Sequence, residues 1–326
     1  MVLVLINCLA ANAQSELNFT QYINAPLLYN PASNGDFDGT CRATGLFSEQ
    51  WRTWQTITAS YEHKLPIGSA GTSFLNVGGA VYQDMFSISN TNFRGAVSIQ
   101  HKFNNHEIIV GAQPIFNMIK SQDLTTKNQP VDYDPTTGTF AGTGTLDPSI
   151  TAAGINENYF NLNAGVLWNG DFSGMKVKGG TYMANILQPN ISYIGDQAKL
   201  SMKLGVHGSA ELAMTSEMDL MPLFLIENKL SSKETKINMG SLIRYKTTAK
   251  TVKHIVFGPL VKTAGNITNV SLYGGMNFGK LDVNASFDFN GSPSQLAGAN
   301  GFELSLIYTC KAKVFSECYR KVCPRF

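Results

Sequence analysis

Cysteine and histidine are the residues of this chain that could support redox, metal or acid–base chemistry. Of its five cysteines, four lie beyond the first 13 residues: Cys41, Cys310, Cys318 and Cys323. An even cysteine count in an oxidising compartment is typical of disulfide bonds. The histidines lie on different predicted strands, at His63, His101, His106, His207 and His254. None has a neighbour at metal-ligand spacing, so we expect neither a metal nor another cofactor.

Motifs for catalysis or nucleic-acid binding are absent from the sequence. There is no G-x-S-x-G, no phosphate-binding loop and no basic patch interleaved with aromatic residues. A serine, a histidine and an acid could still meet from distant strands, but nothing local singles out such a trio. Residues 129–150 contain Asp132, Asp134 and Asp147, which suggest calcium only superficially because the EF-hand spacing is missing. A solvated external loop is the favoured interpretation, and we expect a non-enzymatic protein without a nucleic-acid partner.

The N-terminus has the pattern of a secretory signal. An apolar stretch is followed by Ala11-Asn12-Ala13, a small-x-small cleavage site, so residues 1–13 are predicted to be a signal peptide. The positively charged start is missing, and the signal is therefore expected to be truncated. The alternative is an ordinary buried strand. No apolar run of 18 residues follows, which argues against a transmembrane helix.

Strict alternation of apolar and polar residues predicts β-strands that are polar on one face. Residues 281–289 read LDVNASFDF, and residues 199–214 repeat the pattern. Only 15% of the residues are charged, against roughly 25% in soluble domains. Low charge without extra hydrophobicity suits a barrel whose outer face meets lipid and whose inner face is polar but uncharged. The sequence therefore predicts an all-β, antiparallel up-and-down barrel in the outer membrane.

Alternation and turn signals predict fourteen strands. They lie near 41–52, 55–64, 73–84, 91–103, 106–118, 159–168, 173–185, 199–215, 217–227, 234–246, 252–263, 268–278, 281–290 and 301–310. Such barrels have an even strand number, short periplasmic turns and long external loops. The longest predicted connections, 119–158, 186–198 and 291–300, all fall on the external side of this count. A soluble β-sandwich is the competing architecture, but its strands average only about 5–6 residues.

A closed barrel also predicts a cysteine pairing. The first and last strands of a barrel are neighbours, and Cys41 begins the first while Cys310 ends the last. We therefore expect a Cys41–Cys310 bridge, with Cys318–Cys323 closing a loop in a periplasmic tail over 311–326; the alternative is that all four remain reduced. Residues 41–310 form the predicted barrel, and 14–40 precede it as a periplasmic or barrel-mouth segment.

Several short motifs along the chain resemble those of one family. Their residues are Phe19-Thr20-Gln21-Tyr22-Ile23-Asn24-Ala25-Pro26-Leu27, Tyr29-Asn30-Pro31-Ala32, Gln50-Trp51, Gly78-Gly79 with Tyr82 and Asp84, Asn185-Ile186-Leu187-Gln188-Pro189, Phe287-Asp288-Phe289-Asn290 and Asn300-Gly301-Phe302-Glu303-Leu304. In order and spacing they resemble the PorP/SprF family of type IX secretion system membrane proteins, over nearly all of the mature chain. The cysteine-containing tail and the long 119–158 loop depart from the pattern.

The resemblance implies an outer-membrane barrel that supports secretion, docking or anchoring of a cell-surface adhesin of the gliding type. The implied partners are that adhesin or its C-terminal secretion domain, other periplasmic or outer-membrane type IX components, and the lipid bilayer. A fourteen-stranded lumen could hold a peptide segment but hardly pass a folded protein. The alternative function is a channel or transporter for a small solute. Candidate partner contacts are Gln21, Tyr22, Asn30 and Pro31, which could instead pack inside the barrel mouth.

Overall fold

The computed structural model is a closed antiparallel β-barrel of fourteen strands. It describes residues 17–50, 54–68, 71–85, 88–121, 133–134, 139–140, 156–191, 198–231, 234–264, 267–290 and 300–310. The predicted signal peptide and the tail with Cys318 and Cys323 lie outside these residues. No helix in the described ranges is long and apolar enough to cross a membrane.

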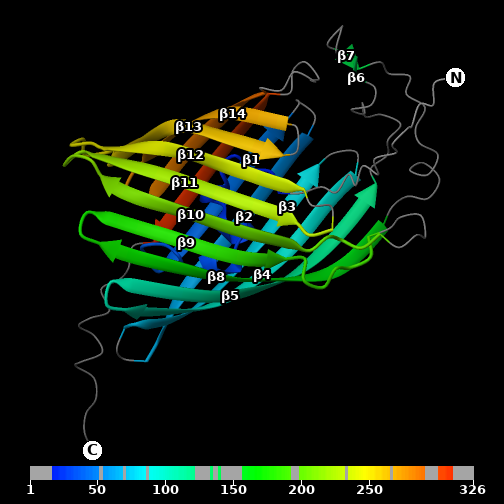
Figure 1. The fold of residues 1–326 in the computed structure, drawn as a ribbon, viewed down its shortest axis with the longest axis horizontal. Coiled ribbons are helices and arrows are strands. Elements are labelled where there is room, and N and C mark those ends of the chain that lie inside the picture. Colours follow the sequence, from blue (N-terminus) through cyan, green and yellow to red (C-terminus); the bar gives the residue numbers. More distant parts are fainter. Residues whose placement is uncertain are drawn as a thin grey trace, which may run out of the picture.

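Each barrel strand is hydrogen-bonded to its sequence neighbours, and β1 closes the barrel against β16 (Figure 1). The barrel strands are β1 (Cys41–Gln50), β2 (Trp54–Ile67), β3 (Ser73–Met85), β4 (Ile88–Phe103), β5 (His106–Ser121), β8 (Asn156–Phe172), β9 (Met175–Ala184), β10 (Lys203–Ala213), β11 (Met218–Lys229), β12 (Thr235–Lys246), β13 (His254–Ala264), β14 (Ile267–Asn277), β15 (Leu281–Asn290) and β16 (Gly301–Cys310). The predicted fold class and strand count are confirmed.

The strand boundaries depart from the prediction at the end of the barrel that carries the long connections. β4, β5 and β8 extend a further three residues there, to Ile88, Ser121 and Asn156. β10 is shorter than predicted and begins at Lys203, because β9 ends before Asn185, whose φ of 60° breaks the extended backbone. A short hairpin of β6 (Tyr133–Asp134) and β7 (Thr139–Phe140) lies within the longest connection.

Alternating side chains separate a lipid-facing surface from a polar lumen. On β15, Phe287 and Phe289 point outward with 39% and 45% of their surface exposed. Their sequence neighbours Ser286 and Asp288 point inward and are 3% and 2% exposed. Because a bilayer replaces water around the outer face, the exposed apolar band is stabilising there.

Short turns gather at one end of the barrel and long connections at the other. Residues 104–105 and 173–174 turn at the end that carries Cys41 and Cys310, whereas 122–155 and 185–202 connect strands at the opposite end. We name the first end the periplasmic rim and the second the outer rim, since barrels of this class place their short turns in the periplasm.

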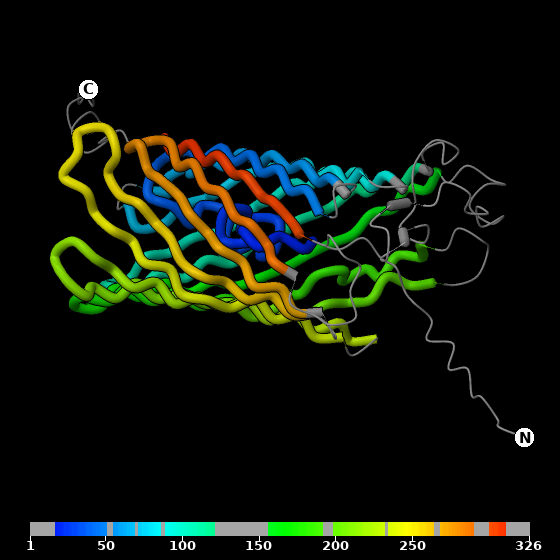
Figure 2. The backbone as a smooth tube through the Cα atoms, turned by 90° about the horizontal axis from the view of Figure 1, so that it is seen from above, coloured from blue at the N-terminus to red at the C-terminus, as the bar shows by residue number. Residues whose placement is uncertain are grey.

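An N-terminal segment lies inside the barrel. Residues 17–40, here called the plug, run through the lumen in three 3-10 turns, η1 (Tyr22–Asn24), η2 (Pro26–Leu28) and η3 (Pro31–Ser33) (Figure 2, blue). The prediction placed 14–40 in the periplasm or at the barrel mouth. In the structure residues 17–40 extend from the mouth into the lumen, where Gln21, Leu27 and Ala32 are at most 1% exposed.

The first and last strands meet at the predicted seam. Their register runs from Cys41 opposite Cys310 to Gln50 opposite Gly301, and a disulfide joins the two cysteines with their Cα atoms 5.0 Å apart. Thr40 donates its backbone N–H to the Cys310 carbonyl at 3.1 Å, so the end of the plug is attached to the same rim.

Peptide mapping under non-reducing conditions should recover the Cys41 peptide joined to the Cys310 peptide. A C41S/C310S variant should still fold, because the backbone hydrogen bonds of the seam remain, but should unfold at a lower temperature in a gel-shift assay. Free thiols at both positions, or Cys310 joined to Cys318 or Cys323, would contradict the pairing.

Candidate functional site

The plug is built from residues that cap short turns rather than from a periodic pattern. Pro26 and Pro31 begin the second and third turns, where proline is tolerated because the missing N–H has no partner in the turn. Asn30 caps the third turn by accepting a hydrogen bond from the Ala32 N–H at 2.9 Å. These local hydrogen bonds give the plug a compact shape, which is packed against the barrel wall.

Charged groups of the wall hold the outer end of the plug. The backbone N–H groups of Thr20 and Gln21 donate to the two carboxylate oxygens of Glu303 at 2.9 and 2.8 Å. The Thr20 hydroxyl donates to Asp288 at 2.8 Å, and Lys262 pairs with Asp288 at 3.1 Å. All five residues are buried, and hydrogen bonds to ionised groups are among the strongest in proteins. The network thus satisfies carboxylates that would be costly to bury alone.

The middle of the plug is bonded through its backbone carbonyls. Arg94 donates to the Leu28 carbonyl at 2.6 Å, and the Gln113 amide donates to the Leu27 carbonyl at 3.0 Å. Both donors lie on adjacent strands of the wall, β4 and β5. Carbonyls that the short turns leave unbonded therefore find partners on the barrel, as buried backbone groups must.

Small residues of the wall let the plug approach closely. The Asn30 amide lies 2.9 Å from His207 Nε2 and donates to the Val166 carbonyl at 3.2 Å. A Cβ at Gly111 would lie 2.5 Å from the Pro31 carbonyl oxygen, a distance that real contacts do not reach. Glycine is therefore required at this point of the wall by the position of the plug.

The periplasmic end of the plug is held by an ion pair. Asp36 pairs with Lys178 at 2.5 Å and accepts a hydrogen bond from the Asn169 amide at 3.0 Å. Burial alone would raise the pKa of Asp36, but Lys178 and Arg42 hold that pKa below its ordinary value. The ionised Asp36 carboxylate therefore stabilises the folded protein at neutral pH, and this stabilisation is lost as the pH falls through the lowered pKa. The Arg42 guanidinium also lies 4.8 Å from the centre of the Phe37 ring.

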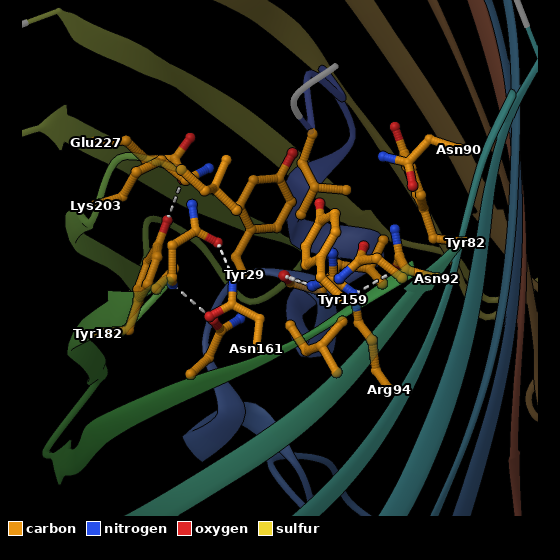
Figure 3. Close-up of a pocket in the computed structure, with 18 residues that line it drawn as sticks. Tyr29, Tyr82, Asn90, Asn92, Arg94, Tyr159, Asn161, Tyr182, Lys203 and Glu227 are labelled. Carbon is orange, nitrogen blue, oxygen red and sulfur yellow. Dashed lines mark hydrogen bonds and ion pairs between the residues drawn. The ribbon is translucent and has the colours of Figure 1, made fainter. Parts of the chain in front are cut away.

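A polar pocket lies between the plug and the outer rim (Figure 3). It is a cavity of about 70 Å³, and Leu28 and Tyr29 of the plug form part of its wall. Six asparagines line it: Asn90, Asn92, Asn117, Asn161, Asn163 and Asn185. Tyrosines 29, 82, 159 and 182, Arg94, and the pair Lys203–Glu227 complete its polar lining. This chemistry suits hydrogen bonding to a polar ligand rather than burial of an apolar one.

All four predicted contact residues lie within the plug. Gln21 and Asn30 are 0% and 1% exposed, Tyr22 is 7% exposed, and Pro31 is buried in the third turn. They therefore occupy the position that the alternative interpretation, packing inside the barrel, describes. Their contact with a partner stays a prediction. In the described part of the chain, no group of three metal-ligating side chains lies close enough to hold an ion.

The wall residues that hold the plug were missed as a site, although several stand in motifs already singled out. The contacts are Gln50 with Asn18, Tyr82 with Phe19, Gly78 with Asn34, and Asp288 and Glu303 with Thr20. The signal that could have found them is charge on the inward face: Asp288 and Glu303 lie on the lumen parity of neighbouring strands. Paired inward carboxylates require a partner inside the barrel.

Replacing Gly111 by valine should displace the plug, because the new side chain would overlap the Pro31 carbonyl. We expect limited proteolysis of G111V in detergent to cut within 17–40 much sooner than in the wild type. Gly274→Val is the matched control, since a Cβ there meets nothing within 4 Å. Equal protection of the plug in G111V and wild type would contradict its position.

Replacing Glu303 by alanine should leave the N–H groups of Thr20 and Gln21 without acceptors. Two such buried donors cost roughly 2–5 kcal/mol, so E303A should unfold at a clearly lower temperature. Glu303→Gln keeps one acceptor oxygen and should be intermediate, and Glu157→Ala, at an exposed position of β8, should be neutral. Unchanged thermal stability in E303A would show that the carboxylate does not hold the plug.

Comparison with known proteins agrees with this architecture. The sequence matches the family described as "Type IX secretion system membrane protein PorP/SprF" over residues 11–308. No curated protein matches it. Among solved structures, the fold is similar to the "CymD monoaromatic hydrocarbon channel", with a TM-score of 0.52, 9% identity, and coverage of 88% of this chain and 93% of that one.

A second similar structure is the "TodX deltaS2S3 mutant monoaromatic hydrocarbon channel", with a TM-score of 0.51, 8% identity, and coverage of 87% of this chain and 92% of that one. At these identities the likeness shows the barrel fold alone. The family match spans almost the whole barrel, including the plug. The chain therefore belongs to the PorP/SprF family of type IX secretion system membrane proteins and is an outer-membrane β-barrel.

Proposed function

We propose that this barrel is a non-enzymatic docking or anchoring component of type IX secretion, which helps a gliding-type adhesin reach and stay on the cell surface. The partner is the adhesin or its C-terminal secretion domain, and other periplasmic or outer-membrane components of the machinery are further partners. The proposal is supported by the plug, which is buried in the lumen and is bonded to the wall at several levels.

The plug favours docking over passage of protein through the lumen. Passage would require the plug to leave, which would break its bonds to Glu303, Arg94 and Lys178. Each bond to a charged group contributes about 1.5–3 kcal/mol in general. The pocket of about 70 Å³ beside the plug has room for only a few water molecules or one small side chain. A filled barrel that presents its rims to partners is the role that this arrangement supports best.

A small-solute channel is the alternative. The barrels of similar fold are described as channels for monoaromatic hydrocarbons. Such apolar solutes do not suit the pocket of this chain, whose asparagines would lose hydrogen bonds to water without replacement. A channel in this protein would therefore carry a polar solute past the plug.

Deletion of the gene in its native bacterium should remove one adhesin from the cell surface while other surface proteins remain. Surface biotinylation followed by mass spectrometry measures this directly. Complementation with the wild-type gene should restore the adhesin, and complementation with E303A should restore it less well. A surface proteome that is unchanged by the deletion would contradict the docking role.

Purified protein in planar bilayers should show almost no steady conductance, because the plug fills the lumen. The G111V variant, with a displaced plug, should conduct more often, and G274V should behave like the wild type. Steady, porin-like conductance in the wild type would favour the channel alternative.

A further inference from the structure

Arg94 is an inward-facing cation without an acidic partner. Among the arginines that the structure describes, Arg42 pairs with Glu62 at 2.5 Å and Arg244 pairs with Asp219 at 2.9 Å. Arg94 forms no ion pair within the described ranges. Its guanidinium donates from Nε to the Asn92 amide oxygen at 2.8 Å and from Nη1 to the Leu28 carbonyl at 2.6 Å. Neutral acceptors thus position the group while its positive charge stays uncompensated.

The surroundings of Arg94 are a cavity rather than packed side chains. Arg94 lines the polar pocket beside Asn92 and Tyr159, as Figure 3 shows. Across the pocket, Lys203 lies 3.7 Å from Glu227, so those two charges compensate each other. The uncompensated charge of the pocket is therefore that of Arg94, and a partly enclosed guanidinium attracts an anion strongly.

A second polar group in the pocket also lacks a partner. Asn90 is only 9% exposed, and its Oδ1 atom accepts no hydrogen bond. A buried acceptor without a donor is destabilising. Because the Oδ1 atom of Asn90 is closed off from the open space of the pocket, the ligand is specified by Arg94 alone and carries an anionic oxygen.

Size and position limit what that ligand can be. A cavity of about 70 Å³ holds roughly one small side chain, since one water needs about 10–15 Å³ by the same measure. Asn90, Asn117 and Tyr159 lie within four residues of the outer ends of their strands. The ligand therefore enters from the outer rim and places only its tip in the pocket.

We propose that the pocket binds a carboxylate of a peptide, at an acidic side chain or at a chain end, with Arg94 pairing the carboxylate. The proposal rests on the docking function, and it specifies the chemistry of the partner segment that the barrel holds. The segment approaches from the cell surface and does not require the plug to move.

Calorimetry on the purified full-length protein in detergent tests this assignment. The probes are acetyl-Gly-Ser-Gly-Glu-Gly-Ser-Gly-amide, the same peptide with glutamine for glutamate, and the glutamine peptide with a free C-terminal carboxylate. The glutamate peptide or the free-carboxylate peptide should bind about tenfold or more tightly than the neutral one, as expected for a charge-assisted pair. Whichever of the two binds better identifies the source of the carboxylate. The preference should weaken as salt is raised.

Asn92→Asp is the decisive variant. It keeps the shape of residue 92 and its bond to Arg94, but it supplies a fixed carboxylate 2.8 Å from Nε. The N92D protein should fold normally and lose the preference for the acidic peptides. Lys102→Gln is the control, because Lys102 lies on the same strand, is 46% exposed at its side chain and is not a residue of the pocket.

Equal binding of the acidic and neutral peptides, or an unchanged preference in N92D, would overturn the assignment. Inorganic phosphate that binds as tightly as the acidic peptide would overturn the peptide as the ligand. The result also distinguishes this proposal from the docking function. If gene deletion removes an adhesin from the surface but calorimetry shows no preference for acidic peptides, the pocket assignment is wrong and the docking function still stands.

Discussion

The arrangement of the lumen depends on one contact. The Glu303 carboxylate accepts hydrogen bonds from the backbone N–H groups of Thr20 and Gln21. A barrel of this size cannot fill its interior with the side chains of its own wall, and its inward polar groups need partners. Glu303, Asp288 and Lys262 find them in residues 18–21 of the plug.

The motifs that run along the chain are parts of this single arrangement. The N-terminal motif supplies the plug, and the last two motifs supply Asp288 and Glu303, more than 260 residues later. Gly78 on β3 and Gly111 on β5 provide close approach elsewhere around the lumen. Residues from distant strands are therefore tied to one another through the segment that they surround.

The sequence allowed three features to be predicted because they follow from local periodicity: the number of strands, the side chains that face the lumen, and the pairing of the first strand with the last. Apolar and polar residues alternate along 281–289 whatever lies elsewhere in the chain, and the even count places Cys41 beside Cys310. The position of the plug was not predictable in the same way. Its three short turns have no period, and its bonds join residues such as Gln21 and Glu303 that are 282 positions apart. The pocket was missed for the same reason. Arg94 stands out only because no acidic side chain of the described residues pairs with it in the folded barrel.

A plug packed in the lumen and a polar pocket toward the outer rim support the proposed docking role better than conduction. The central claim is that residues 18–34 are packed inside the barrel in the isolated protein. Hydrogen–deuterium exchange with mass spectrometry measures this directly, since amides bonded inside the lumen exchange slowly. The account predicts protection of peptides from 18–34 comparable to that of β15 and β16 in the wild type. Complete exchange of these peptides within seconds, with the strands still protected, would contradict it.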